Sequence, residues 1–207
     1  MLTMPHPRMP STAPQPRPPG TDAVYHWAKK RLFSFEPYPA EAWFRAWEPF
    51  DTMVSATQYY NAVSWALPPG SVTAAEPWNA PEDSEPLERT VYLFISHAGM
   101  RARAAARGGE HFNTRVSYLE SAPPPRVTLG DPTWDHAMVT LAASGSEATA
   151  AFPVAARRLL QSWGFSGHIE VRPGGLVVHF AGTKPVPAEL DRLPEASRQL
   201  VVAFGAR

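Results

Sequence analysis

The sequence predicts an α+β fold: a mainly antiparallel sheet of about five or six strands, one long helix packed across it, and further helices at both ends. Three patterns indicate this class. The segment Thr90–Ile95 is nearly continuous in apolar residues, residues 111–120 alternate between apolar and polar, and a Pro-Gly-Gly turn at residues 173–175 separates two short apolar strands. Because helical patterns flank these strands, we expect an N-terminal aromatic pair of helices and C-terminal helices.

The length and composition of the chain predict one folded domain. The 207 residues are 44% apolar and 11% aromatic, which suffices for one core. Seven of the first twenty residues are proline, so we expect a disordered tail over residues 1–20. The remaining chain is expected to fold as an N-terminal helical segment, a sheet core and C-terminal helices, at residues 21–50, 51–182 and 183–207.

Charge and cysteine content exclude several classes of function. Lysine plus arginine and aspartate plus glutamate both number 19, so a nucleic-acid partner is not expected. The absence of cysteine excludes disulfides, thiolate catalysis and thiolate metal sites. No apolar run is long enough to predict a signal peptide or a membrane span, and the expected location is the cytoplasm. We expect no cofactor and no metal.

Aromatic residues are frequent in the expected helical segment, residues 21–50. Val24, Trp27 and Ala28 recur at helical spacing and predict a helix over about residues 21–33. Pro39 suits the first residue of a second short helix, whose apolar face carries three large rings: Trp43, Phe44 and Trp47. Such rings are typical of a core, because they bury the most area, but any that stay exposed would form a partner-binding surface.

The middle of the chain contains the predicted sheet. One strand is expected within residues 52–67, and an acidic exposed loop over residues 75–88. The segment Thr90–Ile95 should be a central strand that pairs with residues 111–120. Between them, residues 100–107 are compatible with either a short helix or the arm of a hairpin.

Carboxylates crowd the turn Gly130–Asp135. Pro132 fixes the backbone at the second turn position, and the Asp131 carboxylate can accept hydrogen bonds from the next backbone amides. This structural interpretation is sufficient for the turn, with Trp134 anchoring it to the core. The catalytic alternative makes Asp131 and Asp135 an acid–base pair with His136.

A strand over residues 137–142 and a helix ending before Gly164 follow the turn, and Ser144 and Glu147 have the spacing of a capping box. The clearest hairpin then joins residues 168–171 to residues 176–180. His168 and His179 should lie on its polar face and, in one register, would be cross-strand neighbours. Two imidazoles without a third ligand do not predict a zinc site.

The stretch Asn113–Val116 and the turn Gly130–Asp135, followed by an apolar strand, a Leu-Leu helix and a glycine-containing hairpin, resemble the soluble domain of an uncharacterised bacterial family. The resemblance covers about residues 57–182. Many members of that family carry two membrane helices before the domain, a segment that this sequence does not show. The resemblance implies the fold and no activity.

The leading functional hypothesis is a non-catalytic interaction, scaffold or accessory protein of a bacterial assembly, which binds another protein or itself. The apolar side of the C-terminal helix, with Leu200 and Phe204, joins the aromatic helix as a candidate partner-binding surface. The second hypothesis is an enzyme whose polar residues converge in the tertiary structure, with these candidates: Asp131, Asp135, His136, His168 and His179. A third is a small-molecule binding module lined by Trp43, Trp47 and Trp65.

Overall fold

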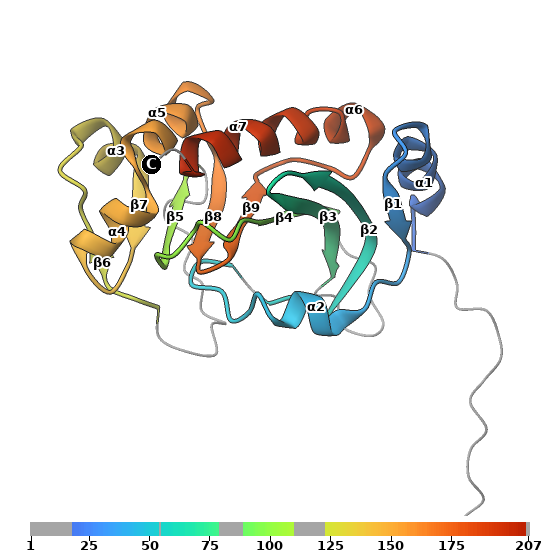
Figure 1. The fold of residues 1–207 in the computed structure, drawn as a ribbon, viewed down its shortest axis with the longest axis horizontal. Coiled ribbons are helices and arrows are strands. Elements are labelled where there is room, and N and C mark those ends of the chain that lie inside the picture. Colours follow the sequence, from blue (N-terminus) through green and yellow to red (C-terminus); the bar gives the residue numbers. More distant parts are fainter. Residues whose placement is uncertain (1–17, 54, 79–88, 110–122, 206–207) are drawn as a thin grey trace, which may run out of the picture.

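A single antiparallel sheet organises the molecule. The computed structural model describes residues 18–53, 55–78, 89–109 and 123–205, and within them nine strands form one sheet in the order β1-β2-β3-β4-β9-β8-β5-β7-β6 (Figure 1). Every neighbouring pair is antiparallel. The strands are β1 (Ser34–Glu36), β2 (Gln58–Leu67), β3 (Gly70–Trp78), β4 (Tyr92–Ser96), β5 (Ala104–Gly108), β6 (Arg126–Val127), β7 (Met138–Leu141), β8 (Gly167–Arg172) and β9 (Gly175–Phe180).

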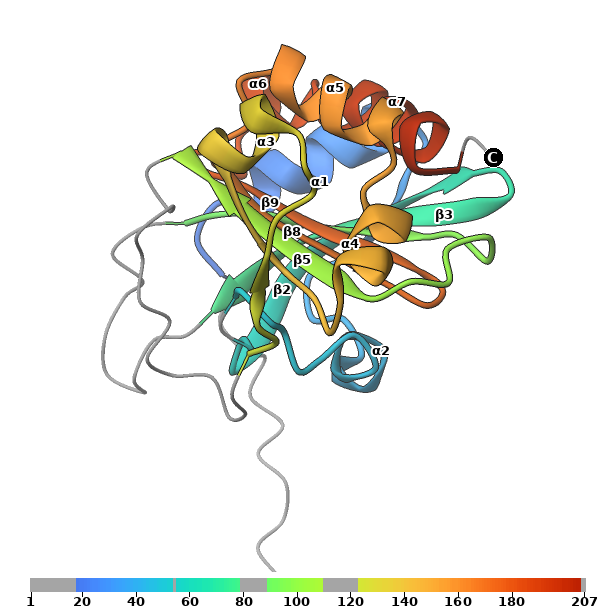
Figure 2. The same cartoon turned by 90° about the vertical axis from the view of Figure 1, so that its left-hand side faces the viewer.

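The helices cover the two faces of the sheet unequally. Figure 2 shows α1, α5, α6 and α7 on one side of the sheet and α2 on the other. The helices are α1 (Thr21–Lys30), α2 (Glu41–Arg45), α3 (Pro132–Ala137), α4 (Gly145–Ala151), α5 (Val154–Ser162), α6 (Pro187–Leu190) and α7 (Leu193–Gly205). In the described ranges, no helix has the length and apolarity needed to cross a membrane.

Buried side chains form two clusters, one on each face. Successive residues of a strand point to opposite faces, so Leu93 and Ile169 enter the main core, whereas Phe94 and Val177 enter the second core. The main core lies under α1, α5 and α7. The second core lies under α2 and consists of Phe44, Trp47, Phe50, Met53, Ala56, Tyr59, Ala62, Ala75, Tyr92, Phe94 and Val177.

The predicted architecture of five or six strands under one long helix is wrong. Two of the nine strands are only three and two residues long, too short to leave an alternating pattern. The helix expected to end before Gly164 is divided into α4 and α5 at Phe152 and Pro153, because proline has no N–H to continue the helix. The longest helix of the described chain is α7, with 13 residues.

Several segments also differ from expectation. Residues 75–78 belong to β3, where the buried Glu76 accepts hydrogen bonds from Asn61 and Arg89, whereas residues 79–88 of the predicted acidic loop lie outside the described residues. The predicted pairing of residues 111–120 with β4 is wrong, because β3 and β9 occupy both edges of β4. Residues 111–120 themselves, and residues 1–17 of the predicted tail, are not described.

The predicted hydrogen bond from a backbone amide to the Asp131 carboxylate is confirmed, but the residues after it form the short helix α3, of which Asp131 is the N-cap. Asp131 Oδ1 accepts the Trp134 amide at 3.2 Å, and Asp131 Oδ2 accepts Arg157 Nε at 3.1 Å. Asp135 Oδ1 accepts a hydrogen bond from the Leu129 amide at 2.9 Å, which links α3 to the residues before the turn. Trp134 is fully buried in the main core, with its indole N–H donated to Thr140 Oγ1 at 2.8 Å.

The Asp131 cap predicts a pH-dependent stability. The Trp134 amide, and after it Arg157, holds the pKa of Asp131 below its usual range. The stabilisation is therefore present above the unfolded-state pKa of about 3.9 and is lost as pH falls through the lower folded-state pKa. Asp131→Ala should cost about 1 kcal/mol of unfolding free energy at neutral pH, and Asp131→Asn, which keeps the cap acceptor, less.

Chemical denaturation of the three proteins at several pH values checks this prediction. The difference in unfolding free energy between the wild type and Asp131→Asn should decrease as pH falls from about 5 to below 3. A difference that is constant over that range would show that the charge of Asp131 has no part in the fold.

Candidate functional site

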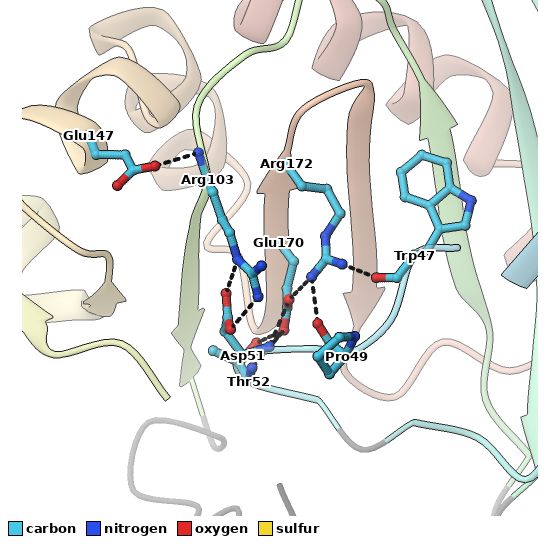
Figure 3. A network of polar contacts seen from close by, with 8 residues as sticks. All are labelled: Trp47, Pro49, Asp51, Thr52, Arg103, Glu147, Glu170 and Arg172. Atoms are coloured by element: carbon cyan, nitrogen blue, oxygen red, sulfur yellow. Dashed lines mark hydrogen bonds and ion pairs between the residues drawn. The ribbon is translucent and has the colours of Figure 1, made fainter. Parts of the chain in front are cut away.

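The most concentrated group of buried polar residues lies where residues 47–52, the segment after α2, cross the second face of the sheet (Figure 3). Trp47 and Phe50 pack there in the second core. Gly175 makes the approach possible, because a Cβ at this position would lie 2.1 Å from the Ile95 carbonyl oxygen and 2.8 Å from the Trp47 ring. The segment is thereby held close against β4, β8 and β9.

Glu170 is the centre of this group. It lies on β8 between the main-core residues Ile169 and Val171, so its side chain points to the opposite face, and it is 0% exposed. Its carboxylate accepts the Asp51 amide at 2.7 and 2.9 Å and the Thr52 amide at 2.6 Å. The Thr52 hydroxyl donates a further bond at 3.0 Å.

Arg172 is the charge partner of Glu170 and a second tie to the same segment. Its Nη2 donates to Glu170 Oε2 at 2.8 Å and to the Pro49 carbonyl at 3.1 Å, while Nη1 donates to the Trp47 carbonyl. The guanidinium also lies 5.4 Å from the centre of the Phe50 ring. The two side chains of β8 therefore bind both donors and acceptors of one backbone segment.

The network continues outward from Asp51. Its carboxylate accepts Arg103 Nη2 at 2.9 Å and Nε at 3.2 Å, and the Arg103 amide donates to Glu147 at 3.2 Å. Glu147 comes from α4, whose N-cap Ser144 accepts the Glu147 amide as the sequence predicts. Elements from both halves of the chain are thus joined through one network of backbone hydrogen bonds and two ion pairs, Arg103–Asp51 and Arg172–Glu170.

This arrangement suits structure better than catalysis. Burial raises the pKa of Glu170, while the Asp51 amide and Arg172 act in the opposite direction. Because the Glu170 carboxylate already accepts bonds from two amides, a hydroxyl and a guanidinium, it has no position left for a substrate proton. We therefore interpret the group as a structural network that holds the segment after α2 against the sheet.

The structure places the Asp and His candidates in two separate regions. Asp131, Asp135 and His136 belong to the α3 turn, whose Trp134 enters the main core. His136 lines a cavity of about 460 Å³ beside Trp134, and no other ionisable side chain of the described chain is among the lining residues. A partner for acid–base chemistry is therefore not brought to His136 by the described residues.

His168 and His179 lie on the opposite face of the sheet and are cross-strand partners in the observed register. Their rings are stacked, with centroids 5.7 Å apart, and His179 Nε2 lies 2.7 Å from Thr90 Oγ1. Within the described residues, no three His, Asp or Glu side chains are grouped so as to hold a metal ion.

The aromatic and apolar candidates also differ in accessibility. Trp43 is 39% exposed and packs edge-on against Phe94 and Trp47, whereas Phe44 and Trp47 are buried in the second core. Leu200 and Phe204 are buried in the main core, so they cannot contact a partner without unfolding. Trp65 also lies in the main core, on the face opposite to Trp47, so the three tryptophans share no cavity.

The outer surface of the helical layer contains a groove that the sequence did not reveal. It consists of two hollows along α7: a mostly apolar one of about 530 Å³ between α5 and α7, and one of about 380 Å³ beside α6 and the end of β9. Gln199 lines both hollows, which together are called the α5–α7 groove. Val202 is 60% exposed beside it. The lining residues of the first hollow are Ala155, Arg158, Leu159, Ser162, Arg198, Gln199, Val202 and Ala203.

Comparison with known proteins identifies a fold and no family. Neither a family model nor a curated protein matches the sequence. Among solved structures, the chain is similar to the crystal structure of the mycobacterial trehalose monomycolate transport factor A, TtfA, with a TM-score of 0.59 and 12% identity over 90% of this chain and 97% of that chain. At this identity the likeness shows the fold alone, in agreement with the weak resemblance to uncharacterised proteins.

Replacement of Glu170 should reveal how much stability the network contributes. Glu170→Ala removes the carboxylate and leaves Arg172 buried without its partner, which should cost about 3 to 5 kcal/mol of unfolding free energy. Glu170→Gln should also destabilise, because its amide NH₂ replaces an acceptor that faces the Asp51 amide or Arg172. Chemical denaturation measures both changes.

The matched control is Glu195→Gln, which changes an exposed glutamate paired with Arg198 on α7. Exposed pairs contribute little, so this variant should unfold almost as the wild type does. Equal, small effects at positions 170 and 195 would refute the assigned role of Glu170.

Proposed function

We propose that the protein is a non-catalytic interaction or scaffold protein, an accessory component of a bacterial assembly, and that its partner binds on the α5–α7 face. The observation that carries this proposal is the apolar groove on the outer surface of that face, with Val202 60% exposed. A solvent-facing valine beside apolar neighbours gains free energy when a partner removes it from water.

The polar residues of the molecule support the non-catalytic part of the proposal. Glu170 and Arg172 hold the segment after α2, and Asp131 caps α3. Each of these charged groups is occupied by bonds within the chain. Glu189, Arg192 and Glu195 line one hollow beside α6 and α7, but there Arg192 pairs with Glu189 and Glu195 with Arg198. An enzyme would instead need ionisable groups that are available to a substrate in a shared cavity.

The structural neighbour gives independent, coarser support. TtfA is named a transport factor, a term for a protein that assists a process rather than for a class of chemical reaction. We extend only this accessory character to the present chain. The cargo of that protein is not part of the proposal.

Affinity purification of the tagged full-length protein from its native cells, followed by mass spectrometry of proteins and small molecules, tests the proposal. We expect a stoichiometric protein partner that Val202→Asp removes, because burying a carboxylate in an apolar contact is costly. The melting temperature should change little, since Val202 lies on the surface.

Leu32→Asp is the matched control, because Leu32 is 93% exposed and follows α1 rather than α5 or α7. It should leave the partner bound. A bound metabolite in the absence of any protein partner would contradict the proposal and favour a ligand-binding role.

A further inference from the structure

We infer that the occupant of the α5–α7 groove is an amphipathic α-helix of a partner protein, with acidic residues beside its apolar stripe. This inference rests on the proposed function, which it makes specific. Three properties of the groove carry it: its length, the lack of free backbone groups along its walls, and its charge.

The groove is long and lined at helical spacing. On α7, Ala196, Gln199 and Val202 follow one another at intervals of three residues. On α5, Ala155, Leu159 and Ser162 provide the facing wall. From Leu193 to Val202 the α7 wall extends for about 14 Å, or two and a half helical turns, which is more than a compact small molecule needs.

The walls favour a helical occupant over an extended one. Both α5 and α7 use their backbone N–H and C=O groups in internal helical bonds, so the middle of the groove offers no sheet edge to an incoming strand. An extended peptide would leave its own backbone groups without partners over an apolar surface, whereas a helix satisfies them internally.

The two hollows suit apolar anchors at separate positions of such a helix. One hollow, about 380 Å³, is lined by Leu193 and by the contacting rings of Trp163 and Phe180, whose centroids are 6.1 Å apart. The other lies beside Val202 and Ala203. Their α7 walls are centred about five residues apart, near Ala196 and between Gln199 and Val202, which is close to the spacing of anchor side chains at positions i and i+4 of a partner helix.

The rim of the groove is net positive. Arg192 pairs with Glu189 and Arg198 pairs with Glu195, so these four charges cancel. Arg158 is exposed on α5 and forms no ion pair with the described part of the chain. A carboxylate beside the apolar stripe of the partner would complement Arg158 and set the orientation of the helix.

Site-specific photocrosslinking in native cells tests the inference. The full-length protein carries p-benzoylphenylalanine in place of Val202 and, in parallel proteins, in place of Trp43 or Leu32, the two other exposed apolar positions considered above. The cross-linked peptide of the partner is sequenced, synthesised and titrated against the wild-type chain. Far-UV circular dichroism then reports whether the peptide becomes helical.

We expect a cross-link from position 202 to an acidic, amphipathic segment that gains helicity on binding. Arg158→Glu should weaken this peptide about fivefold and reduce the salt dependence of its affinity, whereas Arg158→Lys, which retains the charge, should leave both nearly unchanged.

Other outcomes separate the two proposals. A cross-link from position 202 to a basic or non-helical segment, or to a second copy of this chain, would overturn the inference and leave the interaction function standing. A partner cross-linked only from position 43 would overturn the inference and also the placement of the partner on the α5–α7 face, and would leave only the non-catalytic interaction role. No protein partner from any of the three positions, and none in the affinity purification, would overturn both.

Discussion

The buried Glu170 carboxylate is the constraint on which the arrangement of the second face depends. A charged group this far from water is tolerable only when donors surround it, and here the amides of Asp51 and Thr52, the Thr52 hydroxyl and Arg172 do so. The segment after α2 has no regular secondary structure of its own. Four of its backbone groups bond instead to two side chains of β8: the Asp51 and Thr52 amides donate to Glu170, and the Trp47 and Pro49 carbonyls accept from Arg172.

The two faces of the sheet then have different roles. The second face is fixed by this network and by stacked aromatic rings such as Phe44 and Tyr59, 4.2 Å apart. The first face buries the main core under a helical layer, whose outer surface leaves apolar residues between α5 and α7 accessible to solvent. Glu170, Arg172 and Asp51 thus hold the second face together, whereas the hollow between α5 and α7 is mostly apolar. This division favours an interaction protein.

Sequence patterns predicted the regular parts of this structure. The central strand β4, the β8–β9 hairpin, the Asp131 cap and the Ser144 cap follow from local rules, because each depends on neighbouring residues. The extent of the sheet could not be predicted in this way. A glutamate such as Glu76 in β3 is typical of an exposed loop, and the Asn61 and Arg89 side chains that bind it in the buried strand come from other parts of the chain. Glu170 was missed for the same reason. Its one signal was a glutamate between Ile169 and Val171 in a buried strand, and the Asp51 and Thr52 amides that bond to it lie more than one hundred residues earlier.

The most direct test of whether Glu170 holds this segment against the sheet is native-state hydrogen exchange at the amides of Asp51 and Thr52. If the carboxylate holds this segment to the sheet throughout the lifetime of the native state, both amides should exchange only through global unfolding, with the same free energy as the amides of β4 and β8. Exchange of these two amides at nearly unprotected rates, while β4 and β8 remain protected, would show that the segment opens independently and would contradict the role assigned to Glu170.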